Sequence, residues 1–441
     1  MRFRAFLSLL LLVCATHRAH AGEAPVAPPA PSIPSHLTLD EAVDIFRARG
    51  FDLLLVDAAA AGARGDLRAA QAFPNPLLAA SGGHSFTYDP SACVGCSATA
   101  VNANVSDQGL LMDLLVGKRR LKIDVAQQAL AAAELSRVDA QRTLVGLVKV
   151  QYTQAVLARL LLDVARETAK SQTATFNLVN TRLHSGDASE ADAARAETAQ
   201  LEAEQAVDVA TQQVETARAQ LAFLLAVRDV LPVFEVDDQL PPAHTPPSVE
   251  SNSQDSLVAL AREHRADLAA ADAQVRSAEA GVALARRQRV PDVAMIGTYT
   301  QEGHGNNAIQ PPTASLGVSL PLPILYRNQG EIAKAEATLT AQRVQHDKVD
   351  AQLATDVRNA WVALQSAQVR VARMEGPLLK RAREARDLVD YQYQKGAVSL
   401  FERLEAERTF VNVNTEYDQT EADFWTALYQ LEQAIGQELV P

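Results

Sequence analysis

Residues 186–192 read Gly-Asp-Ala-Ser-Glu-Ala-Asp, and residues 396–402 read Gly-Ala-Val-Ser-Leu-Phe-Glu. Both segments fit the pattern Gly-x-x-Ser-x-x-acid, and each lies between two long alanine-rich stretches. The second segment follows the first by 210 positions. A single short match arises easily by chance, so a repeat needs a second, independent match.

A second matched pair lies upstream of these two segments. In the first copy, Asp52-Leu53 is followed by Pro76 and Gly82. The same residue types recur 215 positions later at the same spacing, as Asp267-Leu268, Pro291 and Gly297. Two matched sets in one order and at nearly one offset predict a tandem duplication of about 200 residues, which decides the architecture.

The composition indicates long helices rather than compact domains. A chain of 441 residues is long enough for about three ordinary domains. Aromatic residues make up only 5%, however, and Ala, Gln, Glu, Leu, Arg and Val dominate long stretches. This is the profile of helices that bury surface along seams.

The N-terminus predicts a secretory signal peptide over residues 1–21. Arg2 and Arg4 precede an apolar run over 5–15, and Ala19-His20-Ala21 provides small residues for cleavage. Cys14 as the modified cysteine of a lipoprotein signal is the alternative. Residues 22–37 form an extended lead-in. No later segment has 18 uninterrupted apolar residues, so we expect an exported chain without a transmembrane helix.

The net charge limits the classes of partner, and the two cysteines of one loop suggest a disulfide. The formal net charge is -12, which argues against nucleic acid and against anionic membrane surfaces. Cys93 and Cys96 lie in a loop-like segment. In an oxidising compartment a local disulfide is the simplest interpretation. We expect no cofactor and no metal site.

Each half has one predicted order: helix, two strands, long helix, tight turn, helix. The first repeat covers residues 38–230 and the second 255–436, with a Pro-rich linker over 231–254 and a tail over 437–441. In the first repeat we expect helices from Leu39 to about Phe73, from Gly117 to Arg182 and from Gly186 to about Arg228. In the second we expect helices over about 255–289, about 329–394 and onward to Ile435. Predicted strands cover about 77–87, 101–115, 292–301 and 314–322.

Two details of the second repeat's long helix follow from spacing. Val357, Trp361, Leu364 and Val371 step by four, three and seven, as in a heptad seam. Gly376-Pro377 interrupts the helix and predicts a kink. The fold class is therefore mainly α with a small β part. Four strands cannot close a barrel, so we expect oligomerisation to pair their edges.

The repeated turns have a local explanation. Gly186 and Gly396 suit a left-handed helix end, and Ser189 and Ser399 suit the next N-cap. Asp192 and Glu402, three residues on, then belong to capping boxes or close variants.

Glu405 does not fit that explanation. It shares a helical face with Glu402, which disfavours the pair unless the face meets water or a cation. A solvated outer face and, in a symmetric oligomer, a cation-selecting ring of carboxylates remain as alternatives.

With these features and Pro321-Leu322-Pro323 before Gln329-Gly330-Glu331-Ile332, the chain resembles the TolC-like outer-membrane efflux channels over residues 38–436. Within this family the heavy-metal cation branch looks nearest. The resemblance implies a homotrimer whose strands form one 12-stranded outer-membrane barrel, with a long periplasmic α-helical barrel. It also implies partners: a periplasmic adaptor (membrane fusion protein), an inner-membrane efflux pump and outer-membrane lipid.

The resemblance also assigns residues. It places a periplasmic entrance at Asp192, Tyr393, Glu402 and Glu405, with Asp192 bonded to Tyr393 to hold the entrance shut. It places adaptor contacts at the two turns, 182–189 and 393–399; the contacting residues are Arg182, Leu183, Gly186, Lys395, Gly396 and Val398. Val398 stands where family members can carry an arginine as part of the latch, so we expect either a weaker latch or one that uses Arg403 or Lys395 instead.

Two other functions compete with an efflux channel. A periplasmic adaptor would have one helical hairpin between β-rich halves, whereas this chain has two predicted hairpins. A coiled-coil structural protein would not explain the strands. An enzyme lacks support, because no nucleophile elbow, metal triad or phosphate loop occurs in the sequence.

Overall fold

The computed structural model describes residues 33–87, 89, 91, 97–228, 232–250, 252–302 and 312–439. The chain divides into two units, Met1–Pro34 and Ser35–Pro441, and every element below lies in the second unit. The expected signal peptide with Cys14, and the expected disulfide between Cys93 and Cys96, lie outside the described residues.

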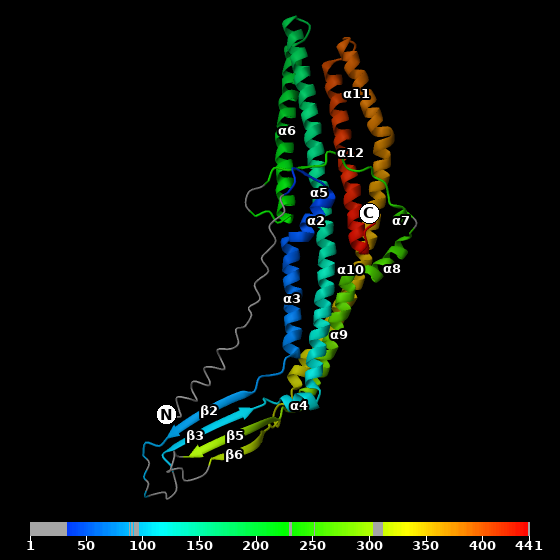
Figure 1. The fold of residues 1–441 in the computed structure, drawn as a ribbon. Helices are drawn as coiled ribbons and strands as arrows, with labels where there is room; N and C mark the ends of the chain where they lie inside the picture. The colour runs from blue at the N-terminus through cyan, green and yellow to red at the C-terminus, as the bar shows by residue number, and fades with distance from the viewer. Residues whose placement is uncertain are drawn as a thin grey trace. The chain divides into compact units, whose positions relative to one another are not determined.

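The first half contains two strands between sets of helices (Figure 1). Its elements are β1 (His36–Leu37), α2 (Leu39–Arg49), α3 (Phe51–Gln71), β2 (Leu77–His84), β3 (Thr99–Ser106), α4 (Leu110–Leu115), α5 (Lys118–His184) and α6 (Glu190–Leu224). Helix α5 has 67 residues, so it is roughly 100 Å long.

The second half repeats this order after a connection that holds β4 (Glu235–Val236) and α7 (Pro247–Glu250). Its elements are α8 (Gln254–His264), α9 (Ala266–Arg287), β5 (Ala294–Glu302), β6 (Thr313–Ser319), α10 (Gln329–Arg373), the π-helical turn η2 (Met374–Leu378), α11 (Leu379–Gln394) and α12 (Leu400–Ile435). The short strands β1 and β4 pair in parallel, which ties the connection to the start of the unit.

Two helices predicted as continuous are each broken once. The helix predicted from Leu39 to Phe73 breaks at Gly50, where ψ is 129°, and the helix predicted over 255–289 breaks at Arg265, where ψ is 117°. The breaks are themselves 215 positions apart, like the matched Asp-Leu pairs. A Cβ at Gly50 would lie 2.5 Å from the Phe46 ring, so this position has no room for a side chain.

The strand predicted over 101–115 is wrong beyond Ser106. Gln108 and Gly109 adopt positive φ, and the Asp107 carboxylate accepts hydrogen bonds from the N–H groups of Gly109 and Leu111. These contacts start α4, in which the apolar run 110–115 is helical. The other strands fall within two or three residues of their predicted bounds.

The four longer strands form one antiparallel sheet in the order β2-β3-β5-β6. The central pair, β3 with β5, joins the two halves of the chain. Within this sheet β2 and β6 are edge strands, and each has a neighbour on one side only.

The sheet has one apolar and one polar face. Strand register aligns residues in rows across all four strands. Two successive rows on one face are Leu78-Val105-Gly297-Leu316 and Ala80-Ala103-Tyr299-Ala314; the alternating rows on the other face are Ala79-Asn104-Thr298-Ser315 and Ser81-Asn102-Thr300-Thr313. The described residues leave this apolar face exposed, and Leu316 on it is 74% exposed.

The helices pack along heptad seams. The C-terminal half of α10 buries Leu353, Val357, Ala360, Leu364, Ala367 and Val371, which confirms the predicted seam, with Trp361 partly buried beside it. This seam packs against Phe424, Leu428 and Leu431 of α12. The predicted interruption at Gly376-Pro377 is the π-helical turn η2, where proline removes a helical hydrogen bond.

One helix in the described part of the chain, α5, holds a window long and apolar enough to cross a membrane by length and composition. Helix α5 contacts α3, α6, α9 and α12, and 44% of that window is buried within the unit. A buried core helix passes the same test.

Candidate functional site

The two repeated turns have the same backbone. Gly186 has φ of 80° and Gly396 has φ of 74°. In the first turn Asp187 N donates to Arg182 O and Gly186 N donates to Leu183 O; in the second, Ala397 N donates to Gln392 O and Gly396 N donates to Tyr393 O. These are Schellman motifs, in which the left-handed glycine satisfies the last carbonyls of the helix.

The serine N-caps start the return helices, as the sequence predicts. Ser399 accepts from Glu402 N, and the Glu402 carboxylate accepts from Ser399 N at 2.8 Å, which completes a capping box. Hydrogen bonds from the Ser399 backbone and hydroxyl lower the pKa of Glu402, so this exposed carboxylate stays ionised. The shorter Asp192 carboxylate accepts instead from the Ser189 hydroxyl at 2.7 Å.

The two hairpins meet just behind their turns. Val179 of α5, Ala196 of α6, Tyr393 of α11 and Leu400 of α12 form a buried cluster, which we call the tip cluster. Val398 packs against its edge. The cluster holds the α5–α6 hairpin against the α11–α12 hairpin within one chain.

Tyr393 lies between two guanidinium groups. The Arg182 Cζ lies 4.8 Å from the centre of its ring and the Arg403 Cζ 5.5 Å, both within the range of cation–π attraction. Arg403 also donates to Asp390 Oδ1 at 2.7 Å and to the Thr175 hydroxyl. Its side chain is only 16% exposed. Arg403 therefore connects α5, α11 and α12 at the tip.

The expected bond between Asp192 and Tyr393 is not made in this structure. Among the described residues, the Asp192 carboxylate bonds to Ser189 and, at 3.5 Å, to Arg195. Of the two proposed latch substitutes, Arg403 reaches Tyr393, whereas the Lys395 ammonium lies over the Tyr391 ring at 5.6 Å.

The two acids of α12 have partners on their own helix. Glu402 is held by its capping box, and Glu405 accepts from Arg408 at 3.0 Å. Both residues are exposed. The expected ring of carboxylates depends on other copies of the chain, so it remains a prediction.

Sequence reasoning missed Thr175 and Asp390 as partners of Arg403, and Gln172 of α5. A signal was present: Thr168, Gln172, Thr175 and Val179 follow the four-three-four spacing of a heptad seam. Polar residues at such positions face a partner helix and need a hydrogen-bond partner. No group of three or more His, Cys, Asp or Glu residues suited to a metal ion occurs in the described ranges.

Comparison with solved structures identifies the fold. Crystal structures of CusC superpose with a TM-score of 0.74 at 19% identity, covering 91% of this chain and 92% of CusC. The open-state outer-membrane channel MtrE of Neisseria gonorrhoeae gives a TM-score of 0.72 at 21% identity, covering 91% of this chain and 89% of MtrE. The fold is that of these channels.

Sequence comparisons name the family. The chain is 24% identical to the cobalt-zinc-cadmium resistance protein CzcC of Cupriavidus metallidurans over 397 residues, 86% of this chain and 85% of CzcC. It is 25% identical to the pyoverdine export outer membrane protein OpmQ of Pseudomonas putida over 354 residues, 77% of this chain and 71% of OpmQ. The outer membrane efflux protein family matches residues 43–227 and again 257–437.

These two matches cover most of the sequence, so the chain belongs to the outer membrane efflux protein family. It is an outer-membrane efflux channel with a helical periplasmic part. Its family consists of passive channels rather than enzymes, and the adaptor and coiled-coil alternatives are set aside.

Proposed function

We propose that three copies of the chain assemble into one channel with a 12-stranded barrel. One observation supports this above the others: the four-stranded sheet has two edge strands and an uncovered apolar face. In hydrocarbon each unpaired backbone group costs several kcal/mol, so a spanning sheet closes on itself. The apolar rows would then face lipid and the rows with Asn102 and Thr298 the lumen.

Light scattering and gel migration test the trimer. The protein purified from outer membranes in mild detergent is expected to have the mass of three chains, and its gel band is expected to run slowly until the sample is boiled. A soluble monomer in the periplasmic fraction would contradict the proposal.

The hairpin tips are the proposed docking surface for a periplasmic adaptor, which connects the channel to an inner-membrane pump. The support is exposure: Gly186, Lys395 and Gly396 are exposed, and no Cβ contact would arise at either glycine. Arg182, Leu183 and Val398 flank these positions as partly buried side chains.

The periplasmic entrance is proposed at Asp192, Tyr393, Glu402 and Glu405, behind those tips. Arg403 takes the latch role in place of the arginine that relatives carry at the position of Val398. The ionised Glu402 and the neighbouring Glu405 favour positively charged cargo.

Heavy-metal cations are the first candidate cargo. The name of CzcC points to cobalt, zinc and cadmium, whereas the name of OpmQ points to pyoverdine, an organic compound. A pump gene of the heavy-metal class beside this gene would favour cations.

A further inference from the structure

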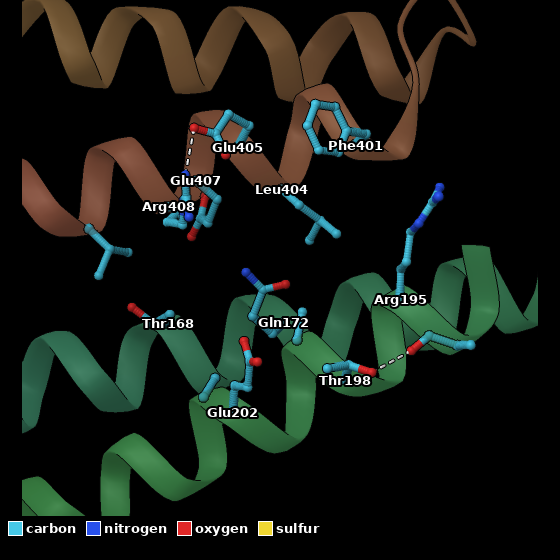
Figure 2. A pocket seen from close by; sticks show the side chains of 14 residues that line it. Thr168, Gln172, Arg195, Thr198, Glu202, Phe401, Leu404, Glu405, Glu407 and Arg408 are labelled. Atoms are coloured by element: carbon cyan, nitrogen blue, oxygen red, sulfur yellow. Dashed lines mark hydrogen bonds and ion pairs between the residues drawn. The ribbon is translucent and has the colours of Figure 1, made fainter. Parts of the chain in front are cut away.

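A groove lies between the two hairpins, a little deeper than the turns. It has a volume of about 640 Å³. Helix α5 forms its floor, and α6 and α12 form its two walls (Figure 2). The groove shares Glu405 with the proposed entrance. Only through this residue does the inference rest on the proposed function.

The floor of the groove carries an unsatisfied acceptor. Gln172 is 7% exposed, and its Oε1 atom has no hydrogen-bond partner among the described residues. Figure 2 shows its amide in the space between the walls. Leaving a buried carbonyl oxygen unpaired costs about 1–3 kcal/mol. A ligand with an N–H donor in the groove would remove that cost.

The walls carry negative charge without matching positive charge. Five charged residues line the groove: Arg195, Glu202, Glu405, Glu407 and Arg408. Arg408 binds Glu405, and Arg195 binds Asp192 outside the groove. In the described structure no ion pair engages Glu202 or Glu407, which extend from opposite walls toward the same space (Figure 2).

The remaining lining contains hydrogen-bond acceptors and apolar surface. The hydroxyls of Thr168 and Thr198 donate to carbonyls of their own helices, so only their oxygen lone pairs are free. The side chains of Phe401 and Leu404 form an apolar surface on one side of the groove. The groove therefore offers carboxylates, neutral acceptors and an apolar wall.

We infer that this groove binds amphiphilic organic cations, meaning protonated amines with an apolar body. The ammonium lies between Glu202 and Glu407 and donates to Gln172 Oε1, and the apolar body packs on Phe401 and Leu404. The channel thus holds a binding site for such compounds in each chain, in addition to its role as a conduit.

Fluorescence titration of the purified full-length channel tests this site. The probe is dansylcadaverine, an apolar fluorophore with a protonated amine, and the matched probe is the anionic dansylglycine. We expect the cation to bind with an enhanced, blue-shifted emission, and at least roughly tenfold more tightly than the anion, since Glu202 and Glu407 attract the ammonium and repel the carboxylate.

Variants locate the site. Glu202→Gln with Glu407→Gln should weaken dansylcadaverine roughly tenfold, and Gln172→Leu should weaken it several-fold. Glu197→Gln, which removes an acid of α6 outside the groove, should leave the affinity unchanged. Glu202 is exposed, so its single variant tests the site even where the buried Gln172 variant fails to fold.

Two results would overturn the inference. Equal binding of cation and anion is one, and undiminished dansylcadaverine binding by the Glu202/Glu407 double variant is the other. If that variant at the same time loses the binding of cobalt chloride, the groove is a metal-cation site instead. The boiling-sensitive trimer band is scored on each sample, so failed channel assembly is distinguishable from an empty groove.

Discussion

The two helical hairpins, α5–α6 and α11–α12, share a turn and differ in what lies behind it. Helix α6 buries alanine at every seventh position: Ala196, Ala203, Ala210 and Ala217. Helix α12 buries Leu400 at its start but also Asp418 further along. Both copies keep the turn, whereas of the two return helices only α12 buries charged residues, Asp418 and Glu432.

This difference has a physical basis. A glycine in the left-handed region and a serine N-cap satisfy the backbone groups at a tight reversal between two helices, and both copies have them. By contrast, which residue type suits a position in the seam between two helices depends on the helix that it faces. Alanine in α6 permits close approach to α5, while Arg403 in α12 makes a connection to both Asp390 and Thr175.

The largest expected effect comes from Arg403→Met. It removes the bonds to Asp390 and Thr175 and the contact with Tyr393, and buried bonds to a charged group contribute roughly 1.5–3 kcal/mol, so the ratio of open to closed entrances should rise roughly tenfold. Conductance of the purified channel in planar bilayers measures this ratio. Arg195→Met in the first hairpin is the control. An equal rise in conductance in both variants would show that the two hairpins contribute alike to holding the entrance closed.

Asp418→Asn should stabilise the protein in a pH-dependent way. Burial, together with the charge of Glu421, raises the pKa of Asp418 to about 6. The folded protein therefore holds this proton more tightly than the unfolded chain, and the ionised group lowers stability as pH rises through about 6.

The expected gain for Asp418→Asn is about 2–3 kcal/mol near pH 8 and less than about 1 kcal/mol near pH 4. Thermal unfolding at the two pH values measures it, with the exposed Glu416→Gln as the control. A shift of the same size at both pH values would show that packing, not ionisation, accounts for the change.

Glu402→Gln with Glu405→Gln should cause a smaller change, a partial loss of cation selectivity. The lowered pKa of Glu402 keeps its charge as pH falls through the ordinary carboxylate range, so selectivity of the parent channel should persist on mild acidification. The reversal potential under a potassium chloride gradient measures selectivity. An unchanged potential in the variant, while Glu384→Gln also has no effect, would argue against a carboxylate ring.

The smallest effect is expected for Tyr393→Phe with Asp192→Ala. Phenylalanine keeps the ring between Arg182 and Arg403, and Asp192 contacts Ser189 and Arg195 rather than the tyrosine hydroxyl. We expect a slight rise in conductance, caused by the weakened cap of α6. A rise in conductance as large as that of Arg403→Met would instead indicate that a bond between Asp192 and Tyr393 is the latch.

The sequence was most informative where local chemistry determines structure. Gly186, Gly396, Ser189 and Ser399 define the turns through backbone φ and capping, both of which depend on neighbours in sequence. The long α5 was predictable from its lack of proline. The π-helical turn at Pro377 was predictable as an interruption, although not in its type.

The sequence was least informative where contacts join distant segments. Thr175 and Arg403 are more than 200 positions apart, and nothing local pairs them. The break at Arg265 was also missed; the side chain of this residue pairs with Asp267 and, across the unit, with Asp356. The strand predicted to reach residue 115 ends at Ser106, where the Asp107 carboxylate accepts from the N–H groups of Gly109 and Leu111 and the chain turns into α4.

The pairing of β3 with β5 constrains how this protein is made. Val105 aligns with Gly297, roughly 190 residues later, and contacts between such distant segments slow folding because a long loop must close first. Neither half of the duplicated chain can complete the sheet alone. The ribosome must therefore synthesise well over half of the polypeptide before β3 and β5 can pair. Until then the unpaired strand edges depend on other molecules to prevent aggregation.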